Sequence, residues 1–285
     1  MASTLNKLTD GTIELTMTIP WADVSKTYEH LVNQTVQNAE LPGFRKGKAP
    51  RDLVEKSLDK AKLYEEVLKV IIPEAYNDAI TEHKLKPVIS PKVELKEANE
   101  GKDWIISALT CQKPAVTLGN YKQAISDLKA GKQKKIWVPG AEPKPDDKDK
   151  PTKPTLDEIL RAVYSTVTVS IPALLVENEV NRLLSDLIDQ TKKLGLSVEQ
   201  YLASTNRTAE SIRREYEEQG KRTLTLEFAL EEIADKEGVL ISDDEIDTVI
   251  KTAKTEDEQK ALSAQRYYLA SLLRRQKTLD TIASL

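Results

Sequence analysis

The residues best suited to binding chemistry stand together in one short basic segment. Residues 43–50 read GFRKGKAP, so an aromatic side chain directly precedes the basic ones. Arg45, Lys46, Lys48 and Arg51 place four positive charges within seven residues, with no acidic residue among them. Such cations bind phosphates, and an exposed ring can anchor in an apolar pocket. The segment therefore predicts a docking site, and an ordinary solvated charged loop is the alternative interpretation.

The same segment does not have the form of a nucleotide-binding phosphate loop. Only three residues separate Gly43 from Gly47, and Ala49 stands where a serine or threonine hydroxyl would hold magnesium. We therefore expect the basic residues to bind an external partner and not a nucleotide.

Groups that could carry out catalysis or hold a metal are few. The two histidines, His30 and His83, have no ligand partner at i+3 or i+4, so the spacing of a zinc site is absent. The one cysteine, Cys111, ends a predicted strand and is interpreted as a small apolar filler. The sequence predicts no catalytic residue, no metal site and no cofactor.

Composition narrows the class of protein. Of 285 residues, 42 are Lys or Arg and 46 are Asp or Glu, giving a net charge of −4, so the whole molecule is not a general polyanion binder. Residues 174–258 alone carry 11 basic and 21 acidic residues, in contrast to the basic segment. A single cysteine fits a reducing compartment, and no apolar run reaches the length of a membrane span or signal peptide. We expect a cytoplasmic protein with no membrane partner.

The elements that must position the basic segment follow from hydrophobic periodicity. Residues 11–19 alternate apolar and polar side chains after the turn pair Asp10 and Gly11, which predicts a strand of a hairpin. From Trp21 the period becomes helical up to the basic segment, and a second helical pattern begins near Leu53. The segment is thus expected to connect two helices.

A third helix and two further strands complete this part of the chain. Apolar residues recur with helical spacing over residues 63–79, where Pro73 predicts a kink. Strand patterns return at residues 92–96 and 104–110. The order of elements predicts an α+β domain, residues 1–125, with an antiparallel sheet and helices on one face.

The remainder divides into a linker and a helical domain. Residues 130–154 hold five of the 13 prolines and a run of charges, so we expect a semi-extended linker over residues 126–154. Residues 155–285 are predicted to form an all-α domain whose helices are long enough to project as arms.

Helix boundaries in this domain have specific signals. Ser197 and Ser242 each precede Gln or Glu by three residues, a capping box that predicts a helix start. Gly195 and Gly238 predict helix ends. The last helix is expected to carry the apolar stripe of residues 262–282.

The basic segment and its surroundings resemble the trigger factor family, the bacterial chaperones that bind beside the exit tunnel of the ribosome. The order Gly-Phe-Arg-x-Gly-Lys-x-Pro at residues 43–50 is long and specific. Similar stretches follow at residues 113–121, 171–180, 195–202 and 234–239. The resemblance covers most of the chain and leaves out the proline-rich interval.

This resemblance implies a ribosome-associated, ATP-independent holdase that binds nascent or unfolded polypeptides and delays misfolding. Its partners on the large ribosomal subunit would be ribosomal RNA and a protein at the tunnel exit, and it also implies a homodimer away from the ribosome. The implied ribosome-binding residues are Gly43, Phe44, Arg45, Lys46, Gly47 and Lys48. The residues that contact substrate are left open. Weak candidates, at linker or helix-start positions, are Val138, Val169, Ile171 and Leu175.

One departure from the family affects the predicted activity. Family members usually carry a prolyl isomerase domain between the two similar parts, but residues 122–155 are too few and too rich in proline to form one. We therefore expect no enzyme activity. Two other interpretations are kept: a peptidyl-prolyl isomerase, which would need a folded unit in this interval, and a generic RNA-binding module, which would bind naked RNA as well as ribosomes.

Overall fold

The structure is a computed structural model that describes residues 2–39, 44–46, 50–51, 53–54, 59–133, 154–253 and 255–285. Its contacts divide the chain into two compact units. The first comprises Met1–Lys113 with Pro172–Leu175, and the second comprises Pro114–Ile171 with Val176–Leu285. Each unit has a hydrophobic core of its own.

The first unit is built on a four-stranded antiparallel sheet of order β1-β2-β4-β3. Its strands are β1 (Ala2–Lys7), β2 (Thr12–Ile19), β3 (Lys92–Glu97) and β4 (Trp104–Cys111). The predicted hairpin turn is confirmed. The Asp10 carboxylate accepts hydrogen bonds from the backbone N and the Oγ1 of Thr12, at 3.0 and 2.8 Å, and Gly11 has φ +89°. Only glycine adopts that φ without strain, so the turn fixes where β2 begins.

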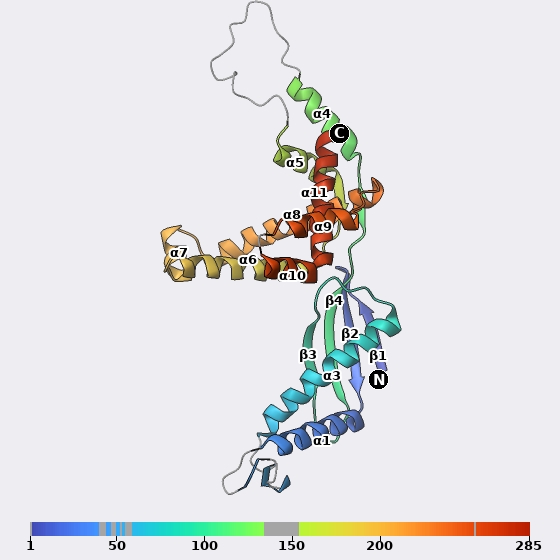
Figure 1. The fold of residues 1–285 in the computed structure, drawn as a ribbon, viewed down its shortest axis with the longest axis vertical. Coiled ribbons are helices and arrows are strands. Elements are labelled where there is room, and N and C mark those ends of the chain that lie inside the picture. Colours follow the sequence, from blue (N-terminus) through green and yellow to red (C-terminus); the bar gives the residue numbers. More distant parts are fainter. Residues whose placement is uncertain are drawn as a thin grey trace, which may run out of the picture. The chain divides into compact units, whose positions relative to one another are not determined.

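Two helices, α1 (Trp21–Asn38) and α3 (Lys60–His83), lie against one face of this sheet (Figure 1). Alternate residues of β2 point toward them and are buried, as the sequence pattern predicted. The side chains of α3 that meet the sheet are Val67, Ile71, Ala75, Tyr76 and Ala79. The predicted α+β architecture, with helices on one face, is confirmed for this unit.

The helices agree with the prediction in position and differ in detail. Pro73 lies inside α3, which continues from Lys60 to His83. Of the helical stretch predicted around Leu53, residues 51, 53 and 54 are helical, and its other predicted apolar residue, Leu58, lies outside the described residues.

The second unit is mainly helical and has its own core. α4 (Tyr121–Gln133), α5 (Leu156–Thr166), α8 (Ala209–Lys236) and α11 (Arg266–Ser284) contribute the buried side chains. A two-stranded antiparallel sheet of β5 (Val116–Leu118) and β6 (Val167–Val169), which the sequence analysis did not predict, joins them.

The division between the units differs from the predicted boundary at residue 125. Tyr121 and Ile125 are buried against Ile159 and Ile233 of the second unit, so α4 belongs to that unit. Part of the predicted linker, residues 126–133, is therefore helix, whereas residues 134–153 lie outside the described residues. The burial of Tyr121 and Ile125 thus decides where the boundary between the units lies. A shift in composition along the sequence does not reveal that boundary.

An arm of the second unit consists of α6 (Ala173–Lys193) from Val176 onward, α7 (Val198–Ser204) and the N-terminal part of α8 (Figure 1). The capping box at Ser197 and the helix end at Gly195, which has φ +72°, are confirmed. Gly220 of α8 is buried, and a Cβ there would lie 3.3 Å from Cγ of Glu179 on α6. The two long helices therefore approach closely at this glycine.

The last predicted helix is two helices in the structure. α9 (Asp243–Lys251) begins at the predicted cap Ser242, and α10 (Glu256–Ala264) is separated from α11 by Gln265, which has φ −106° and ψ 26°. The break lets Leu262 of α10 and Leu269 of α11 pack with α9 in one small core. The apolar stripe was predicted correctly, but tertiary packing breaks the helix that carries it.

Gly119 gives a direct test of the packing between β5 and α5. A Cβ at this position would lie 2.4 Å from the backbone oxygen of Thr166, so Gly119→Ala should lower the free energy of unfolding by about 1–3 kcal/mol. Gly131→Ala in α4 is the matched control, because nothing lies within 4 Å of its added Cβ and it should stabilise by about 0.5–1 kcal/mol. Urea unfolding followed by circular dichroism measures both. Equal effects of the two substitutions would contradict this packing.

A buried tyrosine connects the start of α4 to the end of α8. Tyr121 Oη donates to Glu237 Oε1 at 2.6 Å, and Lys122 Nζ donates to Glu237 Oε2 at 2.9 Å. These two donors, Lys122 foremost, lower the pKa of the Glu237 carboxyl.

Tyr121→Phe should therefore lower the free energy of unfolding by about 1.5–3 kcal/mol at pH 7, because the bond has a charged acceptor. A depressed pKa contributes stability above the pKa of the unfolded chain, which is lost as pH falls through the folded value. The deficit of the variant should thus shrink between pH 5 and pH 3 in urea titrations. A deficit that is unchanged at pH 3 would argue against the role of ionised Glu237, and Tyr267→Phe, at an exposed position, serves as the control.

Candidate functional site

The predicted docking segment connects the two helices that cover the sheet. α1 ends at Asn38 and α3 begins after its cap Asp59, whose side chain accepts a hydrogen bond from Ala61 N at 3.0 Å. The helices contact each other through Tyr28 and Tyr64, whose ring centroids are 5.2 Å apart. The helices on either side of the segment are therefore packed on the hydrophobic core of the first unit.

The aromatic residue of the segment lies at the surface. Phe44 is 42% exposed, and its neighbours Arg45 and Lys46 are exposed as well. The other predicted docking residues, Gly43, Gly47 and Lys48, lie outside the described residues. An apolar ring therefore stands beside two cations, which is the arrangement that the sequence predicted for this part of the segment.

A second exposed apolar side chain follows in the same connection. The carbonyl of Pro50 accepts hydrogen bonds from the backbone N of Leu53 and Val54, at 3.1 and 3.2 Å, so a helical turn begins there. Val54 is buried, whereas Leu53 is 47% exposed. Both residues were predicted to lie in one helix. The sequence pattern does not show which of the two adjacent apolar side chains faces solvent.

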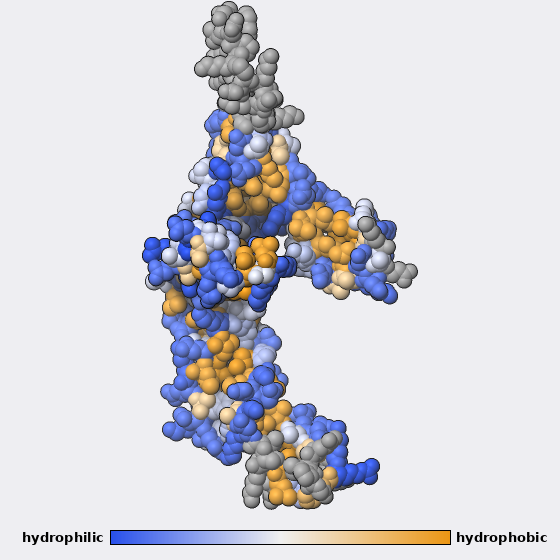
Figure 2. All heavy atoms as spheres, turned by 90° about the vertical axis from the view of Figure 1, so that its left-hand side faces the viewer, coloured by the Kyte–Doolittle hydropathy of each residue, from blue (hydrophilic) through white to orange (hydrophobic). Residues whose placement is uncertain are grey.

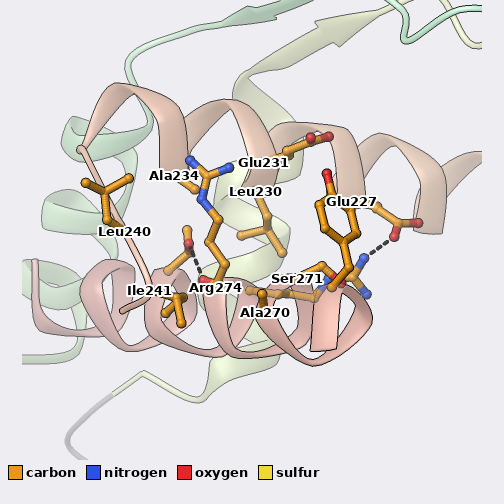
Figure 3. A pocket seen from close by; sticks show the side chains of 12 residues that line it. Glu227, Leu230, Glu231, Ala234, Leu240, Ile241, Ala270, Ser271 and Arg274 are labelled. Carbon is orange, nitrogen blue, oxygen red and sulfur yellow. Dashed lines mark hydrogen bonds and ion pairs between the residues drawn. The ribbon is translucent and has the colours of Figure 1, made fainter. Parts of the chain in front are cut away.

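The second unit contains an apolar groove of about 600 Å³ between α8 and α11 (Figure 3). Leu230 and Ala234 of α8 face Ala270 of α11 across it. Leu240 and Ile241, from the loop between α8 and α9, line one end. This groove could not be predicted from the sequence, because its walls come from residues about 40 positions apart.

Charged side chains also line the groove, and they form ion pairs. Arg275 pairs with Glu227, and Arg274 Nη2 donates to Asp235 Oδ1 at 2.6 Å. Both arginines therefore have their charge balanced by a neighbouring acid. The groove is able to bury apolar groups without leaving these charges unbalanced.

Hydrophobic side chains reach the surface of the second unit in further places (Figure 2). A second apolar cavity of about 340 Å³ lies in the arm, where Leu184 and Leu187 of α6 meet Val198 and Leu202 of α7. Leu194, near the end of α6, is 73% exposed. Such surface is typical of sites that bind other apolar chains.

None of the weak substrate candidates that the structure describes is exposed. Leu175 is buried, which removes it from any binding surface, and Val169 and Ile171 are half-buried. Val138 lies outside the described residues.

The cysteine and the two histidines have ordinary environments. Cys111 is fully buried, and burial raises the pKa of its thiol to about 11, so the nucleophilic thiolate is disfavoured. His83 Nε2 lies 2.9 Å from Ser3 Oγ, and His30 Nε2 lies 3.1 Å from Gln34 Nε2. Within the described ranges, no three acidic, histidine or cysteine side chains gather as metal ligands would. No helix in the part of the chain that the structure covers is both long and apolar enough to span a bilayer.

Comparison with known proteins relates both units to one family. The family model of the bacterial trigger factor protein matches residues 1–135, and the model of the trigger factor C-terminus matches residues 147–284. Only residues 136–146 separate the two matched regions.

Curated relatives are similar over part of the chain. The trigger factor of Lactiplantibacillus plantarum is 35% identical over 123 residues, which are 43% of this chain and 28% of that protein. The trigger factor of Staphylococcus aureus strain JH9 is 38% identical over 108 residues, which are 38% of this chain and 25% of that protein. The matched part thus spans about a quarter of the length of these relatives.

A solved structure agrees over the whole fold. It is described as "Promiscuous Substrate Recognition in Folding and Assembly Activities of the Trigger Factor Chaperone", and it superposes with a TM-score of 0.63 over 100% of this chain and 99% of that chain. Its sequence is only 14% identical, so this likeness concerns the fold alone. With family models that match both ends of the sequence, and a sheet-and-helix unit followed by a helical unit with an arm, the chain belongs to the bacterial trigger factor family.

Proposed function

We propose that this chain is an ATP-independent chaperone that docks on the large ribosomal subunit and holds unfolded polypeptide segments. The observation that carries the proposal is the exposure of Phe44, at 42%, directly beside the exposed cations Arg45 and Lys46. The family to which the chain belongs supports it, and so do the related proteins named trigger factor. The compartment would be the cytoplasm, where the ribosomes are.

Docking would combine two modest interactions. The basic residues of the segment 43–48 would pair with phosphates of ribosomal RNA or acidic groups of a tunnel-exit protein, and Phe44 would enter an apolar pocket. Phosphate contacts fix position and are screened by salt, whereas a buried ring adds affinity that salt affects little. Binding should accordingly be reversible.

Docking would also make weak substrate contacts sufficient. A tethered domain has a high effective concentration near an emerging chain. Its binding sites are therefore occupied by apolar segments of that chain even when the affinity for each segment is low. Exposed apolar side chains of the second unit would provide these contacts and delay collapse or aggregation. Those that are both large and exposed include Leu194, Leu196, Leu240, Tyr268 and Leu272.

We also propose that the chain acts as a holdase and not as a prolyl isomerase. The two family matches leave only residues 136–146 between them, which is too short for a catalytic domain. Neither the isomerase nor the generic RNA-binding interpretation is favoured by a specific observation among the described residues. Dimerisation away from the ribosome stays a prediction from the family.

The docking residues are tested by a triple substitution, Phe44→Ala with Arg45→Ala and Lys46→Ala. Loss of an aromatic anchor costs about 2 kcal/mol, so affinity for ribosomes should fall by roughly 30-fold or more in co-sedimentation. The matched control removes one exposed apolar and two exposed basic side chains elsewhere in the first unit: Val88→Ala, Lys86→Ala and Lys102→Ala. If both triple variants co-sedimented as well as the original chain, with equal circular dichroism, the docking proposal would be wrong.

Salt dependence tests the ionic part of docking separately. Two or three phosphate contacts predict a loss of roughly tenfold in affinity between 50 and 200 mM salt. The titration is done at constant magnesium so that the ribosomes stay assembled. With Phe44→Ala, affinity should drop while the slope against salt is kept. Equal binding of naked RNA by the original chain and by Phe44→Ala would instead favour a generic RNA-binding module.

A further inference from the structure

One end of the groove is bordered by a loop, here called the lip, that carries an exposed leucine. The loop between α8 and α9, residues 237–242, contains Leu240, which is 76% exposed. Its neighbour Val239 is buried, and Val239 N donates to Ala234 O at 2.8 Å, which closes the end of α8. An aliphatic side chain held in water beside an apolar groove contributes nothing to the core of this unit.

Two cations of α11 fix the backbone of this loop. Arg274 Nε donates to Val239 O at 2.9 Å, and Lys277 Nζ donates to Leu240 O at 3.0 Å. Each cation also binds a carboxylate. Arg274 reaches Asp235 at 2.6 Å, and Lys277 reaches Glu245 at 2.8 Å. Successive carbonyls of the loop are thus bound from one helix, and Leu240 is presented in a defined position at the groove.

The groove has the size and chemistry of a binding site for apolar groups. Its volume of about 600 Å³ lies within the range of roughly 300–1,000 Å³ that ligand sites occupy. Leu240 and Glu227 lie at opposite ends of it, with Leu230 and Ala270 between them (Figure 3). Because Arg274 and Arg275 are paired with acids and Glu231 also lines the groove, the site does not favour an anionic occupant, and its apolar surface suits an apolar one.

We propose that this groove binds apolar side chains of an extended, unfolded polypeptide, that Leu240 is a direct contact, and that Arg274 and Lys277 are its positioning residues. The inference rests on the proposed chaperone function and names one site for its substrate. A loop that is already ordered loses little entropy on binding, so fixing Leu240 raises affinity without adding a contact. Removing either cation should therefore weaken binding although neither cation needs to touch the substrate.

The affinity is measured by fluorescence anisotropy with labelled, reduced and carboxymethylated α-lactalbumin, a permanently unfolded chain. Leu240→Ser should weaken binding by about fivefold or more, and Arg274→Ala and Lys277→Met by about threefold each. Leu156→Ser is the matched control, because Leu156 is an exposed leucine of the same unit that does not line the groove, and it should change affinity less than twofold. Unchanged affinity in Leu240→Ser, with the original chain binding well, would overturn the inference.

Further measurements separate the positioning role of Arg274 and Lys277 from a general loss of folding. Amide hydrogen exchange at residues 239–241 should speed up in Arg274→Ala and not in Leu240→Ser. The double variant Leu240→Ser with Arg274→Ala should bind no more weakly than Leu240→Ser alone, because no leucine is left for Arg274 to position. Lys277→Arg keeps the positive charge and should bind as tightly as the original chain, in contrast to Lys277→Met. Additive losses, or exchange that is unchanged in Arg274→Ala, would contradict the positioning role.

Further measurements distinguish this inference from two alternatives: failure of the proposed chaperone function, and binding of a second copy of the chain. Ribosome co-sedimentation should be the same in all groove variants, and substrate affinity should change less than twofold between 50 and 300 mM salt. If the original chain bound no unfolded polypeptide, the proposed function itself would fail. If Leu240→Ser altered only the sedimentation coefficient of the chain and not its substrate affinity, the groove would bind a second copy, and the inference would be overturned.

Discussion

The docking segment depends on the packing of α1 and α3 against one face of the antiparallel sheet. Alternate residues of β2 and β4 form a continuous apolar layer, and both helices bury their own apolar side chains on it. A segment closed between two such helices cannot collapse onto the sheet face that they already cover. Its aromatic residue is then available to another molecule, which is the physical basis for an exposed Phe44.

The second unit meets a different constraint, because it must expose apolar surface without losing its fold. Its stability comes from a separate core in which Tyr121, Ile125 and Ile233 are buried. The groove lies between α8 and α11, and the arm cavity is formed by α6, α7 and the start of α8. Ion pairs such as that of Arg275 with Glu227 balance the charges beside the groove, and bonds from Arg274 and Lys277 hold its lip in place. The core and the groove are thus formed by the same pair of helices, α8 and α11, and Leu230 contributes to both.

Much of this fold could be predicted from local patterns. The alternation of β2, the turn at Gly11 and the caps at Ser197 and Ser242 are short-range signals, and each is confirmed. The strands β5 and β6 were missed because each has three residues, too few to establish a period. The break at Gln265 was missed because only the packing of α10 against α9 requires it.

The candidate site shows the same division. Phe44, Arg45 and Lys46 could be found from the sequence because their chemistry is contiguous. Leu53 could not be separated from its buried neighbour Val54, since exposure depends on which way a single helical turn faces. The groove could not be predicted from the sequence. Leucines at helical spacing can lie in the core or at the surface, and only the pairing of the helices decides which.

The central claim is that the ring of Phe44 itself contacts the large ribosomal subunit, in an apolar pocket. Photocrosslinking tests this most directly, with a benzophenone side chain introduced at position 44 and, as a control, at the exposed position 88. On irradiation with ribosomes, the account predicts crosslinks from position 44 to RNA or protein of the large subunit and almost none from position 88. Crosslinks of equal yield from both positions, or none from position 44 under conditions where the chain co-sediments, would contradict it.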